Sequence, residues 1–241
     1  MTKYNAVLYM YNDLPRAEFV IQGMQEHNPH IPLTVYNGGE DVSFLKTKYN
    51  IDLIQGPNLW TTKTRHPPGG FSYDWFVSFF DFAKKYDPDY LIFLETDVKV
   101  NKKIEIDPVY DVAGPIFGCG YMERLMMYDF WGNYIRGLPF EEDVTTKWPH
   151  KSHTGMGGTA FSRNFFRTCE DKLEYVKLCY ETIPLCSYHD VMISCFARTY
   201  GCSLGDWAEA SDIRGTERIL NERWVHDSDY NKCALIHNYK V

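Results

Sequence analysis

The sequence lacks any long hydrophobic run. No segment of the 241 residues approaches the roughly 18 continuous apolar positions that a membrane span needs, so we expect no transmembrane helix. Residues 1–13, MTKYNAVLYMYND, lead directly into an apolar strand without the apolar core or cleavage site of a signal peptide. These absences predict a cytoplasmic protein.

A concentration of positive charge is also missing. The 25 Lys and Arg residues are outnumbered by 32 Asp and Glu residues, which gives a net charge of −7, and no stretch forms a basic stripe. Nucleic acid is therefore not an expected partner. A phosphate-containing ligand of so acidic a chain is expected to bind through a metal ion.

Paired cysteine motifs are absent as well. The seven cysteines are odd in number, scattered and without a C-x-x-C motif, which predicts reduced, buried thiols. A zinc site formed by Cys186, Cys195 and Cys202 is the alternative, although their spacing fits no usual zinc pattern.

Repeats, low-complexity tracts and linkers are absent too, which predicts one domain over residues 1–241. Residues 1–100 alternate apolar strands with amphipathic helices, and helix starts are expected at Asp13 and Ser72. This alternation predicts an α/β fold with a mostly parallel central sheet flanked by helices. Residues 101–241 are less regular and predict a smaller, mixed subregion.

Two carboxylates follow the most apolar of the expected strands. Glu95, Thr96 and Asp97 come directly after residues 90–94, YLIFL. Acids in such a place are costly unless they are neutralised, and the carboxyl ends of parallel strands are where ligands bind. An isolated E-x-D is more often a solvated strand end, but this position favours a Mg²⁺ or Mn²⁺ site that in turn holds a diphosphate.

Two further motifs suit such a site. His237 follows the apolar ALI and precedes Lys240; an imidazole adds a metal ligand without adding charge, and an ammonium offsets a phosphate. Gly157 and Gly158 would let the backbone approach a ligand closely. The alternative for His237 and Lys240 is a frayed chain end, and the alternative for Gly157 and Gly158 is a plain turn leading into a strand.

A candidate base lies at the start of a later helix. Asp190 stands three residues before Ile193, which begins an apolar stripe, so its side chain is expected to point inward. The helix dipole favours the anionic form of an acid in the first turn. The alternative is an ordinary N-terminal helix acid, which is very common.

In the order and spacing of these motifs the chain resembles the GT-A glycosyltransferases, which transfer a sugar from a nucleotide diphosphate. Their D-x-D motif follows an apolar strand as Glu95-Thr96-Asp97 does, with Glu here in place of the first Asp. The resemblance implies that Asp97 binds the metal directly. It implies that Glu95 faces the ribose or reaches the metal through water.

The resemblance also implies roles for the other motifs. His237 would be a metal ligand and Lys240 would lie near the diphosphate. Gly157 and Gly158 would line the donor sugar and the acceptor. Asp190 would take the proton of the acceptor hydroxyl in an inverting reaction, although His189 stands where the family has a further acid.

Residues 1–100 are implied to bind the nucleotide and residues 101–241 the donor sugar and acceptor. By their positions alone, the expected nucleotide contacts are Tyr11, Asn12, Asn37, Arg65 and Asp74. For residues 58–75 a flexible loop is an equal alternative. Trp207 is either an acceptor-stacking residue or, more commonly for a tryptophan, a core residue.

The implied activity is metal-dependent transfer of a hexosyl group from a UDP-sugar to a hydroxyl of a glycan or glycoconjugate, in a bacterium or a large DNA virus. A sugar-nucleotide pyrophosphorylase is one alternative. It needs a Gly-rich loop after the first strand, where YMYNDLPRA has no glycine. The other alternative is a non-catalytic carbohydrate-binding module whose acids hold a structural cation.

Overall fold

The protein is described by a computed structural model. The described residues are 2–59, 72–118, 152–154, 157–174, 177, 193–194, 196–198, 200–212, 218–220, 223–225, 232–237 and 239. No helix within these ranges is long and apolar enough to cross a membrane.

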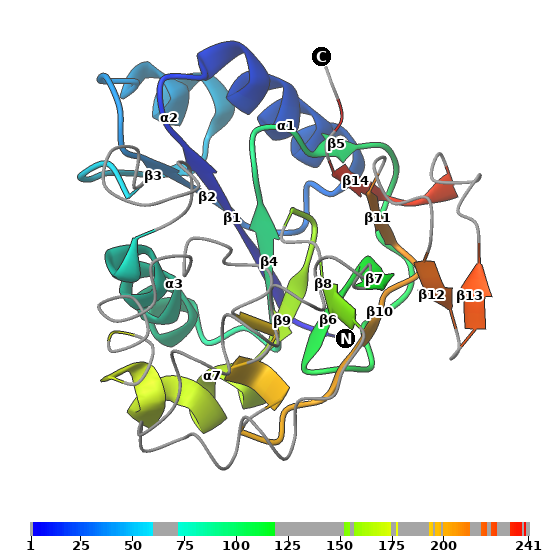
Figure 1. Ribbon diagram of the computed structural model, residues 1–241. Coiled ribbons are helices and arrows are strands. Elements are labelled where there is room, and N and C mark those ends of the chain that lie inside the picture. Colours follow the sequence, from blue (N-terminus) through cyan, green and yellow to red (C-terminus); the bar gives the residue numbers. More distant parts are fainter. Residues whose placement is uncertain are drawn as a thin grey trace.

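A seven-stranded sheet with the order β10-β6-β9-β4-β1-β2-β3 forms the centre of the molecule (Figure 1). Every neighbouring pair is parallel except the two that involve β9, which runs antiparallel to β4 and β6. The mostly parallel central sheet predicted from the sequence is therefore confirmed. The strands are β1 (Tyr4–Met10), β2 (Leu33–Asn37), β3 (Asp52–Gln55), β4 (Tyr90–Leu94), β6 (Val112–Gly114), β9 (Ala160–Ser162) and β10 (Leu204–Asp206).

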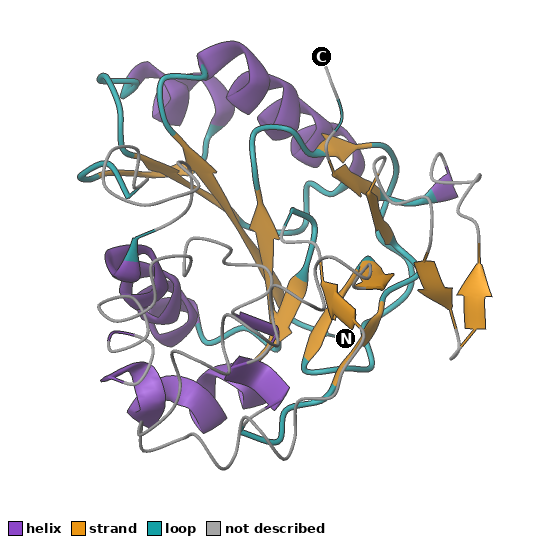
Figure 2. Cartoon of the chain, viewed as in Figure 1, coloured by secondary structure: helices purple, strands orange, loops and turns teal. Residues whose placement is uncertain are grey.

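Helices cover both faces of this sheet (Figure 2). They are α1 (Leu14–His27), α2 (Phe44–Tyr49), α3 (Tyr73–Tyr86) and α7 (Arg163–Cys169), which continues into a 3₁₀ turn over Glu170–Lys172. Alternate residues of β4 point to opposite faces, as the period of a strand requires. Phe93 packs against Trp75 and Phe79 of α3, whereas Ile92 and Leu94 belong to the other core cluster, which contains the buried residues of α1 and α2. Both faces of β4 are thus buried, which explains its uninterrupted apolar sequence.

Two small sheets complete the described fold. One has the order β11-β14-β5, with β11 (Ala210–Asp212), β14 (Leu235–His237) and β5 (Lys99–Val100). The other has the order β13-β12-β7-β8, with β13 (Arg223–Val225), β12 (Arg218–Leu220), β7 (Ile116–Gly118) and β8 (Ser152–Thr154). The first of them joins the C-terminal residues to the chain that follows β4.

Several side chains of the second half belong to the core. Trp207 is 2% exposed, and its Nε1 donates a hydrogen bond to the Ile106 carbonyl at 2.8 Å, so it is a core residue and not a surface for an acceptor sugar. Among the described cysteines, Cys169, Cys202 and Cys233 are buried and in no disulfide, as predicted. Cys186 and Cys195 lie outside the described residues.

Candidate active site

The candidate site lies where the strand order reverses. The chain passes from β1 to β2 and β3 on one side and then returns to β4 on the other side of β1. In open α/β sheets ligands bind outside the carboxyl ends of the strands at such a switch point. Residues 11–13 follow β1 and residues 95–97 follow β4, so both segments meet at this edge.

The acids after β4 are held in a reverse turn. The backbone N–H of Val98 donates to the Glu95 carbonyl at 3.1 Å, and β5 begins immediately afterwards. Val98 is fully buried, whereas the side chains of Glu95 and Asp97 are 14% and 32% exposed. The turn therefore fixes the backbone and leaves both carboxylates at the surface of the sheet edge.

A backbone ladder brings His237 to the same place. In the antiparallel pair of β14 with β5, Ile236 lies opposite Lys99. The N–H of Tyr239 continues the ladder by donating to the Asp97 carbonyl at 2.9 Å. Strand pairing thus juxtaposes residues 140 positions apart, and His237 enters the site as a consequence of main-chain geometry.

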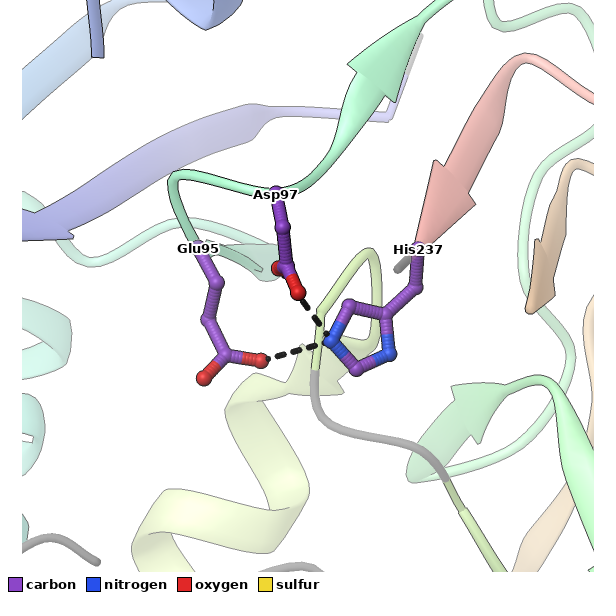
Figure 3. A group of neighbouring side chains, drawn as sticks. All are labelled: Glu95, Asp97 and His237. Atoms are coloured by element: carbon purple, nitrogen blue, oxygen red, sulfur yellow. Dashed lines mark ion pairs between the residues drawn. The ribbon is translucent and has the colours of Figure 1, made fainter. Parts of the chain in front are cut away.

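Glu95, Asp97 and His237 converge on one point (Figure 3). The His237 Nε2 lies 3.0 Å from Glu95 Oε2 and 3.4 Å from Asp97 Oδ1. One ligand atom from each of the three residues lies within 4.8 Å of the others. The His237 side chain is only 8% exposed, so the imidazole has a fixed position beside the two carboxylates.

These dimensions suit a divalent cation. Ligands lie about 2.1 Å from Mg²⁺, which puts neighbouring corners of an octahedron about 3 Å apart. The two carboxylates supply the oxygen donors that suit Mg²⁺ and Mn²⁺, and the imidazole adds one nitrogen donor. The distances do not rank Asp97 above Glu95 as a ligand, because the Glu95 oxygen is the nearer of the two to His237.

Tyr239 anchors the residues that carry the imidazole. Its ring stacks on Phe19 of α1, with centroids 6.1 Å apart and planes inclined by 5°. The Lys99 Nζ lies 4.8 Å from the centroid of the same ring. These two contacts hold Tyr239, two residues after His237, against α1 and β5.

The backbone of Gly157 lies against the His237 ring. A Cβ atom added to Gly157 would stand 2.8 Å from His237 Cγ and 2.9 Å from Nε2, and nearer still to Cδ2. Any side chain at position 157 would therefore collide with the imidazole. Gly158 has a φ of +86°, a conformation that favours glycine.

The predicted nucleotide contacts after β1 and β2 have different environments. Tyr11 is 41% exposed, and Asn12 has a φ of +51° with its Oδ1 accepting from the Glu40 N–H at 2.9 Å. Asn37 is fully buried: its Oδ1 accepts from the Gly39 N–H, and its Nδ2 donates to the Gln55 Oε1. The Asn37 side chain thus shapes the loop after β2, and its contact with a nucleotide stays a prediction.

Asp13, which its sequence position predicts only as a helix cap, also lies beside the candidate site. It makes no capping hydrogen bond with its side chain; instead its Oδ2 lies 3.4 Å from the Thr96 Oγ1, which donates to it. Arg16 pairs with the same oxygen at 3.5 Å. Its place directly after the first strand was the signal that pointed to this edge.

Asp74 lies exposed in the first turn of α3. Burial raises the pKa of Tyr36 in β2, and the charge of Asp74 raises it further. Arg65, His189, Asp190 and Lys240 lie outside the described residues, so their roles stay predictions.

Comparisons with known proteins give a structural likeness. No family model matches the chain, and a search of curated proteins finds no match. Among solved structures, the chain is similar to the glycosyltransferase GlyE of Streptococcus pneumoniae TIGR4, with 12% identity and a TM-score of 0.48 over 87% of this chain and 46% of that one. The apo form of GlyE gives 13% identity and a TM-score of 0.45 over 86% and 45%. The chain thus spans less than half the length of these structures.

Proposed function

We propose that the protein is a metal-dependent glycosyltransferase of the GT-A type, which transfers a hexosyl group from a nucleotide diphosphate sugar to an acceptor hydroxyl. The observation that carries the proposal is the convergence of Glu95, Asp97 and His237 at the switch point of the sheet. Three potential ligands at the ligand-binding edge of a mostly parallel sheet are what a nucleotide-diphosphate site needs.

The three residues would hold Mn²⁺ or Mg²⁺. A cation bound there would supply electrostatic stabilisation of the negative charge that grows on the departing nucleoside diphosphate. The two carboxylates would balance the charge of the ion, and the buried imidazole would fix its position. Lys240, which follows closely in the chain, is proposed to contact the diphosphate.

The acceptor side of the proposal rests on Asp190. As a general base it would remove the proton of the acceptor hydroxyl while that oxygen attacks the anomeric carbon from the face opposite the leaving group, which inverts the configuration. The proposed donor is a UDP-sugar and the proposed acceptor a glycan or glycoconjugate. Tyr11 and Asn12 lie at the carboxyl end of β1, where the nucleotide would reach them.

Calorimetry with Mn²⁺ and UDP tests the metal site directly. We expect the protein to bind Mn²⁺, to bind UDP more tightly with Mn²⁺ than without it, and to lose both properties in Asp97→Asn. The matched control is Asp171→Asn, because the Asp171 side chain is 70% exposed and pairs only with the adjacent Lys172 in the salt bridges of the described chain. If UDP binding did not depend on the metal, or did not occur, the proposal would be refuted.

Turnover separates the proposal from its alternatives. A panel of sugar nucleotides incubated with the protein and Mn²⁺ should show slow hydrolysis of one donor, which Asp190→Asn reduces. A pyrophosphorylase would instead form sugar nucleotide from a sugar phosphate and a nucleoside triphosphate. A binding module would bind sugar without hydrolysing any donor.

A further inference from the structure

Gly157 is the residue that limits where the His237 imidazole can lie. We propose that Gly157 is a positioning residue that seats this imidazole for metal binding. The inference rests on the proposed metal site and adds a role that neither the motif nor its position in the chain assigns to the glycine.

The contact is on the side of the ring that bears the ligand atom. A Cβ on Gly157 would stand closest to Cδ2, and 2.9 Å from Nε2. The same Nε2 lies 3.0 Å from Glu95 Oε2 and 3.4 Å from Asp97 Oδ1. Any displacement of the ring by a side chain at 157 would therefore move the ligand atom relative to both carboxylates.

The glycine backbone cannot withdraw to make room. The Gly158 N–H donates to the Phe93 carbonyl at 2.8 Å, and the Phe93 N–H donates to the Thr159 carbonyl at 2.8 Å. Phe93 is fully buried in β4, two residues before Glu95. The loop that carries Gly157 is thus bonded to the strand that carries the acids.

The histidine strand is equally fixed. Leu235 and Ile236 are fully buried, and β14 is paired on both of its sides, with β11 and with β5. Because both backbones are held, a side chain added at position 157 would force the His237 side chain to rotate. A shift of about 1 Å in a ligand is enough to impair a site of this kind.

The substitution Gly157→Ala isolates the steric effect. The φ of Gly157 lies outside the left-handed region, so the added methyl group is the main change that alanine makes there. Gly201→Ala is the matched control. Gly201 has a φ of +81°, and no atom of the described residues lies within 4 Å of the added Cβ, so alanine there is expected to destabilise the fold without contact with Glu95, Asp97 or His237.

The first measurement is Mn²⁺ affinity, determined from the electron paramagnetic resonance signal of free Mn²⁺. We expect Gly157→Ala to weaken binding at least about tenfold, the scale of a lost supporting contact at a metal ligand, and Gly201→Ala to leave binding within about twofold of the wild type. Equal Mn²⁺ affinity of Gly157→Ala and the wild type would overturn the inference and leave the proposed function standing.

The second measurement needs no metal. Thermal unfolding of Gly157→Ala, His237→Ala and the double variant forms a double-mutant cycle. We expect Gly157→Ala to lower Tm by roughly 5 °C in the wild-type background and by much less in the His237→Ala background, where the methyl group meets no ring. Equal shifts in the two backgrounds would overturn the inference. If the wild type bound no Mn²⁺, the proposed function would fail, and this cycle would still decide whether Gly157 seats the imidazole.

Discussion

Removal of the Asp111 carboxylate should loosen the sheet edge formed by β9, β6 and β10. Asp111 directly precedes β6. Its Oδ2 accepts from the backbone N–H and the hydroxyl of Ser203, both at 2.8 Å. Its Oδ1 accepts from the Ser162 hydroxyl at 2.8 Å and the Asn164 amide at 3.0 Å. One side chain thus ties the start of β6 to the end of β9 and the start of β10.

The size of the effect follows from these four hydrogen bonds. Hydrogen bonds to a charged acceptor contribute about 1.5–3 kcal/mol each, but the group is partly exposed and the bonds are coupled, so they do not add. We expect Asp111→Ala to lower the free energy of unfolding by about 3 kcal/mol. Asp111→Asn should cost about half as much, because its amide oxygen still accepts from Ser203 while its NH₂ group faces the Asn164 donor.

The direction of the pKa shift of Asp111 determines how its contribution to stability changes with pH. Burial opposes ionisation of Asp111, but hydrogen bonds from Ser203, Ser162 and Asn164 outweigh it and lower the pKa of this carboxyl. A depressed pKa stabilises the fold above the unfolded value of about 3.9, and this contribution is lost as the pH falls through the folded value. The difference between the wild type and Asp111→Ala should therefore be constant from about pH 7 to 5 and shrink below about pH 4.

Urea unfolding at pH 7, 5, 4 and 3.5 measures both effects, with Asp171→Ala as an exposed-acid control that should change the free energy of unfolding by less than about 0.5 kcal/mol. A loss in Asp111→Ala no larger than that of the control at pH 7 would refute the hydrogen-bond reasoning. A difference that grows as the pH falls would refute the assigned direction of the pKa.

Three further changes test the site and its support. His237→Ala should abolish the thermal stabilisation by Mn²⁺, which for the wild type at 100 times its Kd is about 2.7 kcal/mol; equal shifts in a melting assay would contradict the metal role. Tyr239→Ala should weaken Mn²⁺ binding about tenfold by calorimetry while Tyr239→Phe keeps it, since the ring stacks on Phe19 and the Asp97 bond uses the backbone. Asn28→Ala should lower the free energy of unfolding in urea by about 2–3 kcal/mol, because the buried Asn28 side chain accepts from the Ile104 N–H and donates to the Lys102 carbonyl. An unchanged unfolding midpoint would show that the segment after β5 does not depend on Asn28.

The first half of the fold was predictable because its patterns are long. Residues 90–94 form an unbroken apolar run, and the structure buries them on both faces as β4. The helix expected after Asp13 is α1, and its buried residues Ala17, Val20, Ile21 and Met24 have the i, i+3, i+4, i+7 spacing of an amphipathic helix. Once β4 lies beside β1 in parallel, the position of Glu95 and Asp97 at the carboxyl edge follows.

The elements that position His237 were not predictable, because they are a pair of very short strands and the backbone of Gly157. β5 has two residues and β14 has three, which is too short for any periodic signal. The Gly157-Gly158 pair indicates close approach, but the sequence alone cannot say that the neighbour of Gly157 is His237 and not a ligand. The position of Asn37 predicts a nucleotide contact, which stays a prediction; the sequence did not indicate the buried hydrogen bonds of its amide, which follow the ordinary turn chemistry of an Asn-Gly-Gly segment.

The ladder that carries His237 also links metal binding to the positions of β14 and Tyr239. The two carboxylates lie at the start of β5 and the imidazole at the end of β14, so a cation between them would join the two strands of the same pair. A ligand that binds only the docked arrangement stabilises it by mass action. The fixed contacts of Leu235 and Ile236 hold the strand in place before any ion arrives, which keeps the ordering cost of binding low. Tyr239 depends more directly on the site, because its backbone N–H donates to the carbonyl of Asp97 itself.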